Sequence, residues 1–570
     1  MLHVTLFIEL LRSHPRRTVW AMALVQALLW TLVPAIFYAA PPGRLPEVIA
    51  VGHEFQLGSY LGPPLAFWLA NAAYVFGKFG VYLLSQICVV VTYWAVFQLG
   101  SVIIGARHAA FAIVLMGGVV AFTVPTPEFG PAVLATALWA LALLHYWRAA
   151  EQQKFGYWFT LGIDLGLLLL TTYASVVLIA LLLGYMLSSA RGRDKLTEAG
   201  PWISGVIIAL AIFPLLIWLD HPGGAVRTPA AVQLEFNPLT GLCLLGWLLA
   251  AHVGLAILVL LGYGFPGTRR EDLPTVERAS ADPEGKRFVY FFALAPTLAM
   301  TLFAMLFGGP AQVPLMPLAV MSGLAVMATA PEHLHLVYQR LAGIAWAALV
   351  VLPAFLAIGA VIALPWVFPY ELAITRPAGD IGRFFGESFQ RRTGKPLAIV
   401  TGDEQTAMLV ALAAPSRPSV YYDAMPERTP WISRQDIDTK GAIVVWPTTD
   451  TTGVPPPEIK ARFPDLIPDV PRVFERNVQG FVPPVRIGWG VIRPRGLASE
   501  TPPAPPPPVQ PVVPPSPPVV QPQSQPRQVP QAQSELPKPP PAAQPQQPPP
   551  RPQQPPPRRQ QPRRDPMFQW

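Results

Sequence analysis

Long apolar stretches are the feature of this sequence that most restricts its fold. A helix needs about 20 residues to cross the hydrocarbon core of a bilayer, and the first 365 residues contain many such stretches with few or no internal charges. Charged residues make up 13% of the chain, against about 25% in soluble globular proteins. An ordinary cytosolic enzyme is therefore excluded, and the sequence predicts a polytopic α-helical membrane protein.

The apolar pattern predicts about eleven transmembrane helices, placed by the length of each stretch and its lack of internal charge. The two spans between 157 and 190 are separated by a very short turn. The predicted spans cover residues 18–40, 80–101, 108–125, 131–147, 157–171, 173–190, 202–219, 240–263, 288–307, 313–329 and 342–365.

The loops between these spans differ strongly in positive charge. One set carries 15 Lys and Arg residues, and the other carries only Arg44, Lys78 and Arg227. Because positive loops remain on the cytoplasmic side, we expect the N-terminus inside and everything after residue 365 outside. This arrangement predicts a multi-pass protein of the bacterial inner (plasma) membrane with a periplasmic C-terminal region.

Three regions are predicted from these boundaries. Residues 1–365 form the transmembrane domain, with a large first periplasmic loop at 41–79. Residues 366–497 form a small extracytoplasmic α/β domain, with helices at 381–389 and 404–414 and buried strands at 397–400, 419–422 and 441–446. Residues 498–570 form a tail.

The tail is rich in Pro, Gln and Arg. Of residues 501–570, 28 are proline, so the segment lacks the apolar content to fold, and we expect it to be disordered and extended. Its net positive charge suits contact with anionic envelope polymers or lipid head groups, and a solvated spacer is an equally good interpretation. We expect it to be dispensable for catalysis.

The first periplasmic loop carries the polar groups that suggest chemistry. It contains Glu47, His53 and Glu54, a Gly-Ser-Tyr turn, and the double proline Pro63-Pro64, which leads into the aromatic segment LAFWLANAAYVF. That segment has apolar residues on one face, as expected of a helix lying along the membrane interface.

This order of acid, turn, PPL and aromatic helix resembles the C-type glycosyltransferases of family 39. That group includes protein O-mannosyltransferases and the lipid A aminoarabinose transferase, and the chain also resembles the rhizobial lipopolysaccharide galacturonosyltransferases. Further similar segments are VLATALWALALLHYWRA, LGLLLLTTYASVVL, TGKPLAIVTGDEQTA and APSRPSVYYDAMPERTPWI. The resemblance implies a GT-C-like fold and inverting transfer of a sugar from a polyprenyl-phosphate donor to a lipid or protein acceptor on the outer face.

The chain departs from the family pattern where the family carries cations. Arg44 stands where similar proteins have an acid, Leu61 and Gly62 replace a Lys-His pair before the prolines, and Thr172 replaces a lysine before Tyr173. Either other basic groups hold the donor phosphate, or the protein is a decayed transferase that binds lipid or assists assembly. A membrane transporter is a third interpretation, although no inverted repeat supports it.

Three acids are candidates for the catalytic carboxylate. Glu47 aligns with the loop glutamate of the family, so the resemblance makes it the first choice for a general base. Glu54, beside His53, and Glu128, at the outer mouth of spans three and four, are the alternatives. Each can also be an ordinary surface or helix-terminal acid.

Four outer cations are candidates for binding the donor phosphate, and they are Lys78, Arg227, Arg376 and Arg383. Interfacial snorkelling would explain them equally well. The sequence has no DxD pair or nucleotide-binding loop in a suitable context, so we expect no metal and no cofactor. Asp164 lies inside an apolar span, where a structural hydrogen bond is the favoured interpretation.

Overall fold

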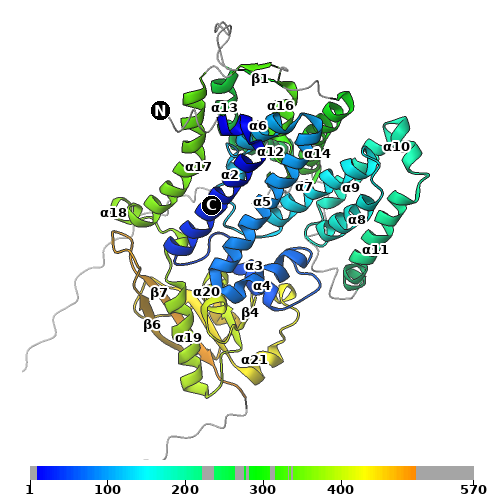
Figure 1. Cartoon of the computed structure of the whole chain (residues 1–570). Coiled ribbons are helices and arrows are strands. Elements are labelled where there is room, and N and C mark those ends of the chain that lie inside the picture. Colours follow the sequence, from blue (N-terminus) through cyan, green and yellow to red (C-terminus); the bar gives the residue numbers. More distant parts are fainter. Residues whose placement is uncertain are drawn as a thin grey trace, which may run out of the picture. The chain divides into compact units, whose positions relative to one another are not determined.

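A computed structural model places most of the chain in a helical region followed by a small mixed sheet (Figure 1). The structure describes residues 9–220, 236–263, 275–277, 282–307, 315–330, 333–335 and 338–495. The predicted disordered tail lies outside these residues.

The apolar helices lie at the predicted spans, except that the second extends back to Leu65 and includes the segment expected to lie along the interface. In the described part of the chain, six helical segments are long and apolar enough to cross a membrane. Five of them are single helices, namely α2 (Pro15–Phe37), α7 (Pro131–Ala150), α11 (Ala199–Asp220), α14 (Pro283–Phe307) and α17 (Gln339–Ile362). The sixth, Leu65–Ile103, consists of α4 (Leu65–Ala73), the short 3-10 helix Tyr74–Phe76 and α5 (Gly77–Ile103).

The remaining predicted spans are a bent pair and four shorter apolar helices. Helices α12 (Pro238–Ala251) and α13 (Val253–Tyr263) meet at an angle of 45°. The shorter helices are α6 (Ala106–Met116), α8 (Gly156–Leu169), α9 (Ser175–Leu187) and the segment Met316–Thr329, which includes α16 (Ser322–Thr329) and most of α15 (Leu315–Leu318). The span predicted at 108–125 ends early as a helix because two glycines follow Met116. The polytopic helical fold is therefore confirmed.

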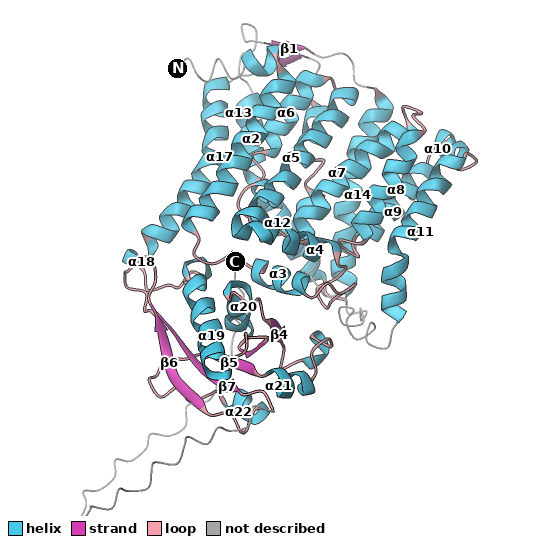
Figure 2. Ribbon diagram, turned by 60° about the horizontal axis from the view of Figure 1, so that its bottom comes forward, coloured by secondary structure: helices cyan, strands magenta, loops and turns pink. Residues whose placement is uncertain are grey.

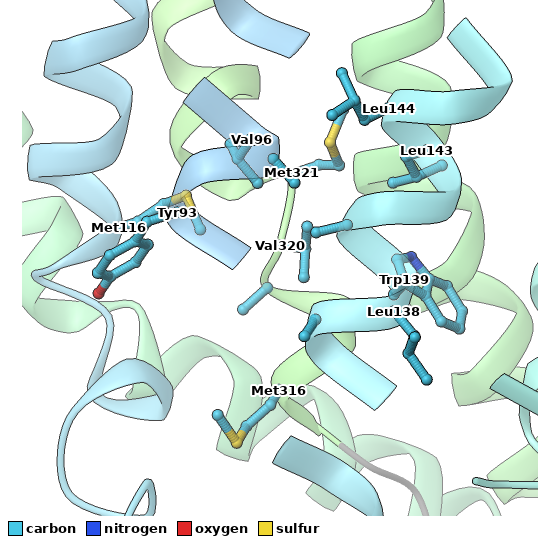
Figure 3. Packing of buried hydrophobic residues seen from close by; sticks show 14 of the residues in the cluster. Tyr93, Val96, Met116, Leu138, Trp139, Leu143, Leu144, Met316, Val320 and Met321 are labelled. Atoms are coloured by element: carbon cyan, nitrogen blue, oxygen red, sulfur yellow. The ribbon is translucent and has the colours of Figure 1, made fainter. Parts of the chain in front are cut away.

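Burial separates central helices from lipid-facing ones. In the most apolar window of α7, 78% of residues are buried, against 17% in α17 and 11% in α11. Figure 3 shows the centre, where Val320 and Met321 lie between side chains of α5 and α7, among them Val96 and Trp139. Dispersion between closely packed side chains drives such packing, because lipid is as apolar as the core.

The first outer loop folds into two short helices. Helix α3 (Leu45–His53) begins after Arg44 with a proline in its first turn, where the missing N–H costs nothing. It crosses α4 so closely that a Cβ on Gly52 would lie 2.0 Å from the carbonyl oxygen of Phe67. A glycine is therefore required there, and α3 is fixed beneath the helical region.

The C-terminal region contains a five-stranded mixed sheet in the order β4-β3-β5-β7-β6 (Figure 2). Strands β3, β4 and β5 are parallel, and β7 joins β5 and β6 in antiparallel pairs. The strands are β3 (Ile399–Gly402), β4 (Ser419–Tyr421), β5 (Ala442–Pro447), β6 (Pro468–Phe474) and β7 (Val485–Ile492).

Helices cover this sheet and contribute its main core. Helix α19 (Ala378–Thr393) places Ile381, Phe385 and Phe389 against the strands, as its spacing predicts. Helix α20 (Glu404–Ala413) crosses between β3 and β4, and its N-terminus is capped by Asp403. The three predicted strands and both helices are confirmed, whereas β6 and β7 were not predicted.

Smaller elements complete the described chain. They are α10 (Ala190–Lys195), the antiparallel pair β1 (Thr275–Glu277) and β2 (His333–His335), α18 (Leu364–Val367), α21 (Arg434–Lys440), α22 (Pro457–Arg462) and the 3-10 helices Val120–Phe122, Ala373–Thr375 and Pro426–Arg428.

The orientation in the membrane remains a prediction from loop charge. An alkaline phosphatase reporter fused after residue 480 is expected to be active, and one fused after residue 285 inactive, because the positive loops stay inside. A fluorescent reporter that folds only in the cytoplasm should give the reverse pattern. Phosphatase activity at 285 with none at 480 would invert the topology and place Glu47 on the cytoplasmic side.

Candidate functional site

Glu47 lies in the first turn of α3 and is 8% exposed. Its Oε2 accepts a hydrogen bond from Nε of Arg44 at 2.8 Å, one helical turn back. Its Oε1 accepts the hydroxyl proton of Tyr60 from the Gly-Ser-Tyr turn. The helix N-terminus adds positive potential at the same point, so this carboxylate is buried, paired and fixed in orientation.

Tyr60 connects Glu47 to the sheet. Its hydroxyl lies 2.6 Å from that of Tyr422, and the two rings meet edge to face with centroids 5.6 Å apart. Since the Tyr60 proton is donated to Glu47, the Tyr422 hydroxyl donates to the Tyr60 oxygen. Burial, and then the neighbouring Tyr422 and Glu47, raise the pKa of Tyr60. Both phenols therefore remain protonated and form a directed chain ending on the Glu47 carboxylate.

Two residues of the C-terminal region, Tyr422 and Glu404, lie near Glu47 because of the direction in which strands β4 and β3 run. Tyr422 directly follows β4, and Glu404 follows β3 by two residues. Carboxyl ends of neighbouring parallel strands meet at one edge of a sheet, which is where ligands bind in open α/β folds. Helix α20 contacts α3 along this edge, and the two helices lie side by side in Figure 2.

Arg428 lies over both tyrosines. Its guanidinium carbon is 4.9 Å from the centroid of the Tyr60 ring and 6.0 Å from that of Tyr422. Glu404 lies 3.8 Å from the same guanidinium. Burial and the Glu47 charge raise the pKa of Glu404, while Arg428 and Arg44 oppose that rise. The charged groups of the loop and the sheet thus form one electrostatic cluster.

Glu128 joins the same cluster through the backbone. Its Oε1 accepts a hydrogen bond from the Arg44 N–H at 2.7 Å. Gly43 has φ +51°, a left-handed conformation that favours glycine, and the Glu128 carboxylate occupies the space where a Cβ would lie. Burial raises the pKa of Glu128, and its contacts with Arg44 reduce the rise. The structure therefore brings Glu47 and Glu128 together around Arg44.

The raised pKa of Glu128 predicts a pH-dependent effect on stability. A carboxyl whose folded pKa exceeds its unfolded pKa binds more protons in the folded state, so its contribution to stability falls as pH rises through that interval. We expect Glu128→Gln, which can still accept the Arg44 N–H, to raise the thermal unfolding midpoint in detergent at pH 8. The difference should shrink towards pH 4. The assignment would be contradicted if the unfolding midpoint of the variant, relative to that of wild type, were lower at pH 8 than at pH 4.

Glu54 and His53 lie at the other end of α3. The Glu54 carboxyl interacts with Ser419 and Lys440, although burial outweighs both and raises its pKa. His53 lies near Arg417, and burial followed by that charge lowers its pKa. Their described partners differ from those of Glu47, so the structure separates them from the tyrosine pair.

The predicted phosphate-binding cations occupy different places. Lys78 donates to the carbonyl of Tyr38 just after α2. Arg376 binds Glu371 at 2.8 Å and Gln405 at 3.3 Å, and Arg383 is exposed on α19. Arg227 lies outside the described residues. The phosphate role of all four stays a prediction.

The positions where family cations are missing lie on two contacting segments. The N–H of Leu65 donates to the carbonyl of Leu170 at 2.9 Å, which joins the chain after Leu61 and Gly62 to the chain before Thr172. None of these three substituted positions supplies a charge. The cations that the structure does place in the cluster come from elsewhere: Arg44 contacts Glu47, and Arg428 lies over the Tyr60 ring.

Asp164 forms a structural contact inside the helical region. Its carboxylate lies 2.5 Å from Nδ1 of His145 on α7, and the His145 ring stacks on Tyr157. The expected intramembrane hydrogen bond is therefore present. Within the described ranges, no group of three His, Cys, Asp or Glu residues could hold a metal ion.

Sequence reasoning missed Tyr60, Glu404, Tyr422 and Arg428. The polar residues directly after the two parallel strands were a usable signal, because the ends of such strands converge. The approach of that edge to the first loop had no comparable signal in the sequence.

Comparison with known proteins gives one family match. Residues 62–218 match the family model described as dolichyl-phosphate-mannose-protein mannosyltransferase. None of the curated proteins matches the chain by sequence.

Solved structures extend the comparison beyond that segment. ArnT from Cupriavidus metallidurans bound to undecaprenyl phosphate aligns with a TM-score of 0.51 and 11% identity, over 83% of this chain and 97% of ArnT. The apo form gives a TM-score of 0.51 and 10% identity over the same shares. The chain has the ArnT fold. The expected resemblance to the C-type glycosyltransferases is thereby confirmed.

Most residues of the candidate site lie outside the segment that the family model matches. The family match ends at residue 218, so Glu404, Tyr422 and Arg428 lie beyond it. Glu47 and Tyr60 lie just before it. The site is therefore assembled mainly from residues that flank the segment recognised by sequence.

Proposed function

We propose that this protein is a membrane glycosyltransferase. It moves a sugar from a polyprenyl-phosphate donor to a lipid acceptor of the lipopolysaccharide type, or to a protein, on the periplasmic face of the inner membrane. The family match over residues 62–218 and the ArnT fold support this class of reaction. The ArnT structure bound to undecaprenyl phosphate supports the type of donor.

The arrangement around Glu47 is the observation that carries the proposal. A buried carboxylate held by Arg44 and Tyr60 is oriented to accept a proton from a hydroxyl group placed beside it. The acceptor oxygen then attacks the anomeric carbon as the bond from that carbon to the phosphate oxygen breaks. The bond electrons leave with the polyprenyl phosphate, and the acceptor proton goes to Glu47, which is the group that activates the nucleophile.

A single displacement of this kind inverts the anomeric carbon, because attack and departure occur on opposite faces. The base must then lie on the acceptor side and a cation on the phosphate side. Positioning and electrostatic stabilisation supply most of the rate enhancement, since the phosphate is already a good leaving group.

A transfer assay with the purified full chain tests the proposal. Undecaprenyl-phosphate-linked sugars and lipid acceptors are incubated with the protein in detergent, and release of undecaprenyl phosphate and glycosylation of the acceptor are measured. We expect both products in equal amounts without added metal. Binding of undecaprenyl phosphate without transfer for any sugar tested would instead favour a decayed transferase that binds lipid.

A further inference from the structure

Arg428 is a cation of the outer sheet region that the proposed chemistry has not yet used. It closes the 3-10 helix Pro426–Arg428, and its side chain is 33% exposed. Among the described residues, only the Glu404 carboxylate lies within 4.0 Å of its guanidinium, and their separation of 3.8 Å exceeds a normal hydrogen bond. The guanidinium plane lies near the Tyr60 ring, so its N–H groups remain available for an oxyanion.

Arg44 provides a second guanidinium in the same cluster, and its Nε donates to Glu47. The Arg44 side chain is 64% exposed. Both Arg44 and Arg428 act electrostatically on Glu404. The two arginines therefore border one patch, although they lie 384 positions apart in the sequence.

Of these two arginines, Arg428 has the longer and weaker contact with an acid. The Glu47 charge is matched by Arg44. Burial raises the pKa of both Glu128 and Glu404, which reduces the preference of these groups for the anionic form. An approaching anion can displace Glu404 from Arg428 at small cost, because their contact is long and partly exposed.

We propose that Arg428 binds the phosphate of a lipid-linked donor beside the Tyr60–Tyr422 pair. The outer α/β region thereby supplies a charge that the chain lacks at Leu61 and Thr172. This inference rests on the proposed function for its choice of ligand. Guanidinium groups bind phosphate oxygens through two parallel N–H bonds, and they stabilise the charge that the phosphate gains when its bond to the sugar breaks.

Binding of undecaprenyl phosphate to the purified full chain tests the inference without any transfer step. We expect Arg428→Gln to weaken binding by about 10-fold or more, since hydrogen bonds to charged groups contribute about 1.5–3 kcal/mol. Arg428→Lys should recover part of the affinity, because it keeps the charge but loses the paired geometry. Undecaprenol, which has no phosphate, should bind wild type and Arg428→Gln equally.

Arg434→Gln is the matched control. Arg434 is also an exposed arginine of the sheet region stacked on an aromatic ring, 5.7 Å from the centroid of Phe463, and it donates to the carbonyl of Arg462. Its loss should leave undecaprenyl phosphate binding unchanged. Inorganic phosphate that competes with the lipid in wild type would identify the phosphate group as the recognised part, and lack of competition would assign recognition to the intact lipid phosphate.

Two results would overturn the inference. One is unchanged affinity of Arg428→Gln for undecaprenyl phosphate, and the other is an equal loss of undecaprenol binding, which would indicate a structural defect. Thermal unfolding of each variant checks folding. If wild type transfers no sugar but binds the lipid phosphate through Arg428, the proposed function fails while the phosphate site stands.

Discussion

Replacing Glu47 by glutamine is expected to lower the rate of sugar transfer by about 100-fold or more, the usual scale for loss of a general base. Glutamine fills the same volume and can accept the Tyr60 hydrogen bond, but it cannot take the acceptor proton. Donor binding should change little, because the proposed phosphate contact comes from Arg428, which pairs with Glu404 rather than with Glu47. The measurement is the steady-state rate of acceptor glycosylation, with lipid binding determined in parallel.

Glu54→Gln is the control for this experiment. Glu54 lies at the opposite end of the same helix, beside Ser419 and Lys440, so its loss should leave transfer nearly unchanged. Wild-type rates in Glu47→Gln would make Glu47 a structural partner of Arg44 and would pass the role of base to Glu128 or Glu54.

Replacing Tyr60 by phenylalanine is expected to lower transfer by about 10- to 100-fold, since a hydrogen bond to a charged group contributes about 1.5–3 kcal/mol. The ring remains in place against Tyr422 and Arg428, so the change removes only the hydroxyl that orients the Glu47 carboxylate. The loss should appear in kcat more than in KM, because the carboxylate acts in the transition state.

Tyr74→Phe is the matched control for Tyr60. The Tyr74 hydroxyl also joins the first loop to the sheet region, donating to the carbonyl of Leu412 at 3.2 Å, but it does not contact Glu47. A similar loss in both variants would mean that docking of the two regions, rather than the carboxylate, is affected. In a cycle with Tyr422→Phe, the double variant should lose less than the sum of the single losses, because both hydroxyls act through one chain.

The sequence predicted the fold well where one physical signal dominated. The lengths of the apolar runs located the membrane helices, since the bilayer sets the length that a helix needs. Three buried strands and two helices of the outer region followed from residue patterning. Strands β6 and β7 were missed because β6 is an edge strand with a largely exposed burial pattern and several prolines, so it lacks the continuous apolar run of a central strand.

The site was predicted less completely. Glu47 followed from the family resemblance, and the structure shows it buried and paired with Arg44, as a surface acid would not be. Its catalytic role stays a prediction. Glu128 was proposed from its expected position at the outer mouth, and the structure places it against Arg44. The four cations predicted to bind the donor phosphate were chosen because the sequence places them close to the membrane. That criterion does not consider whether a guanidinium group already has a close partner.

The sequence by itself determined that this protein is a bundle of apolar helices followed by a C-terminal α/β region. The length of an apolar run and the periodicity of its residues are local properties, so both can be read without the tertiary structure. The tertiary structure alone decided that Tyr422, Arg428 and Glu404 lie beside Glu47. Their approach depends on the parallel order of β3 and β4 and on the contact of α20 with α3. No local pattern encodes that contact, because it forms between segments that are more than 300 residues apart.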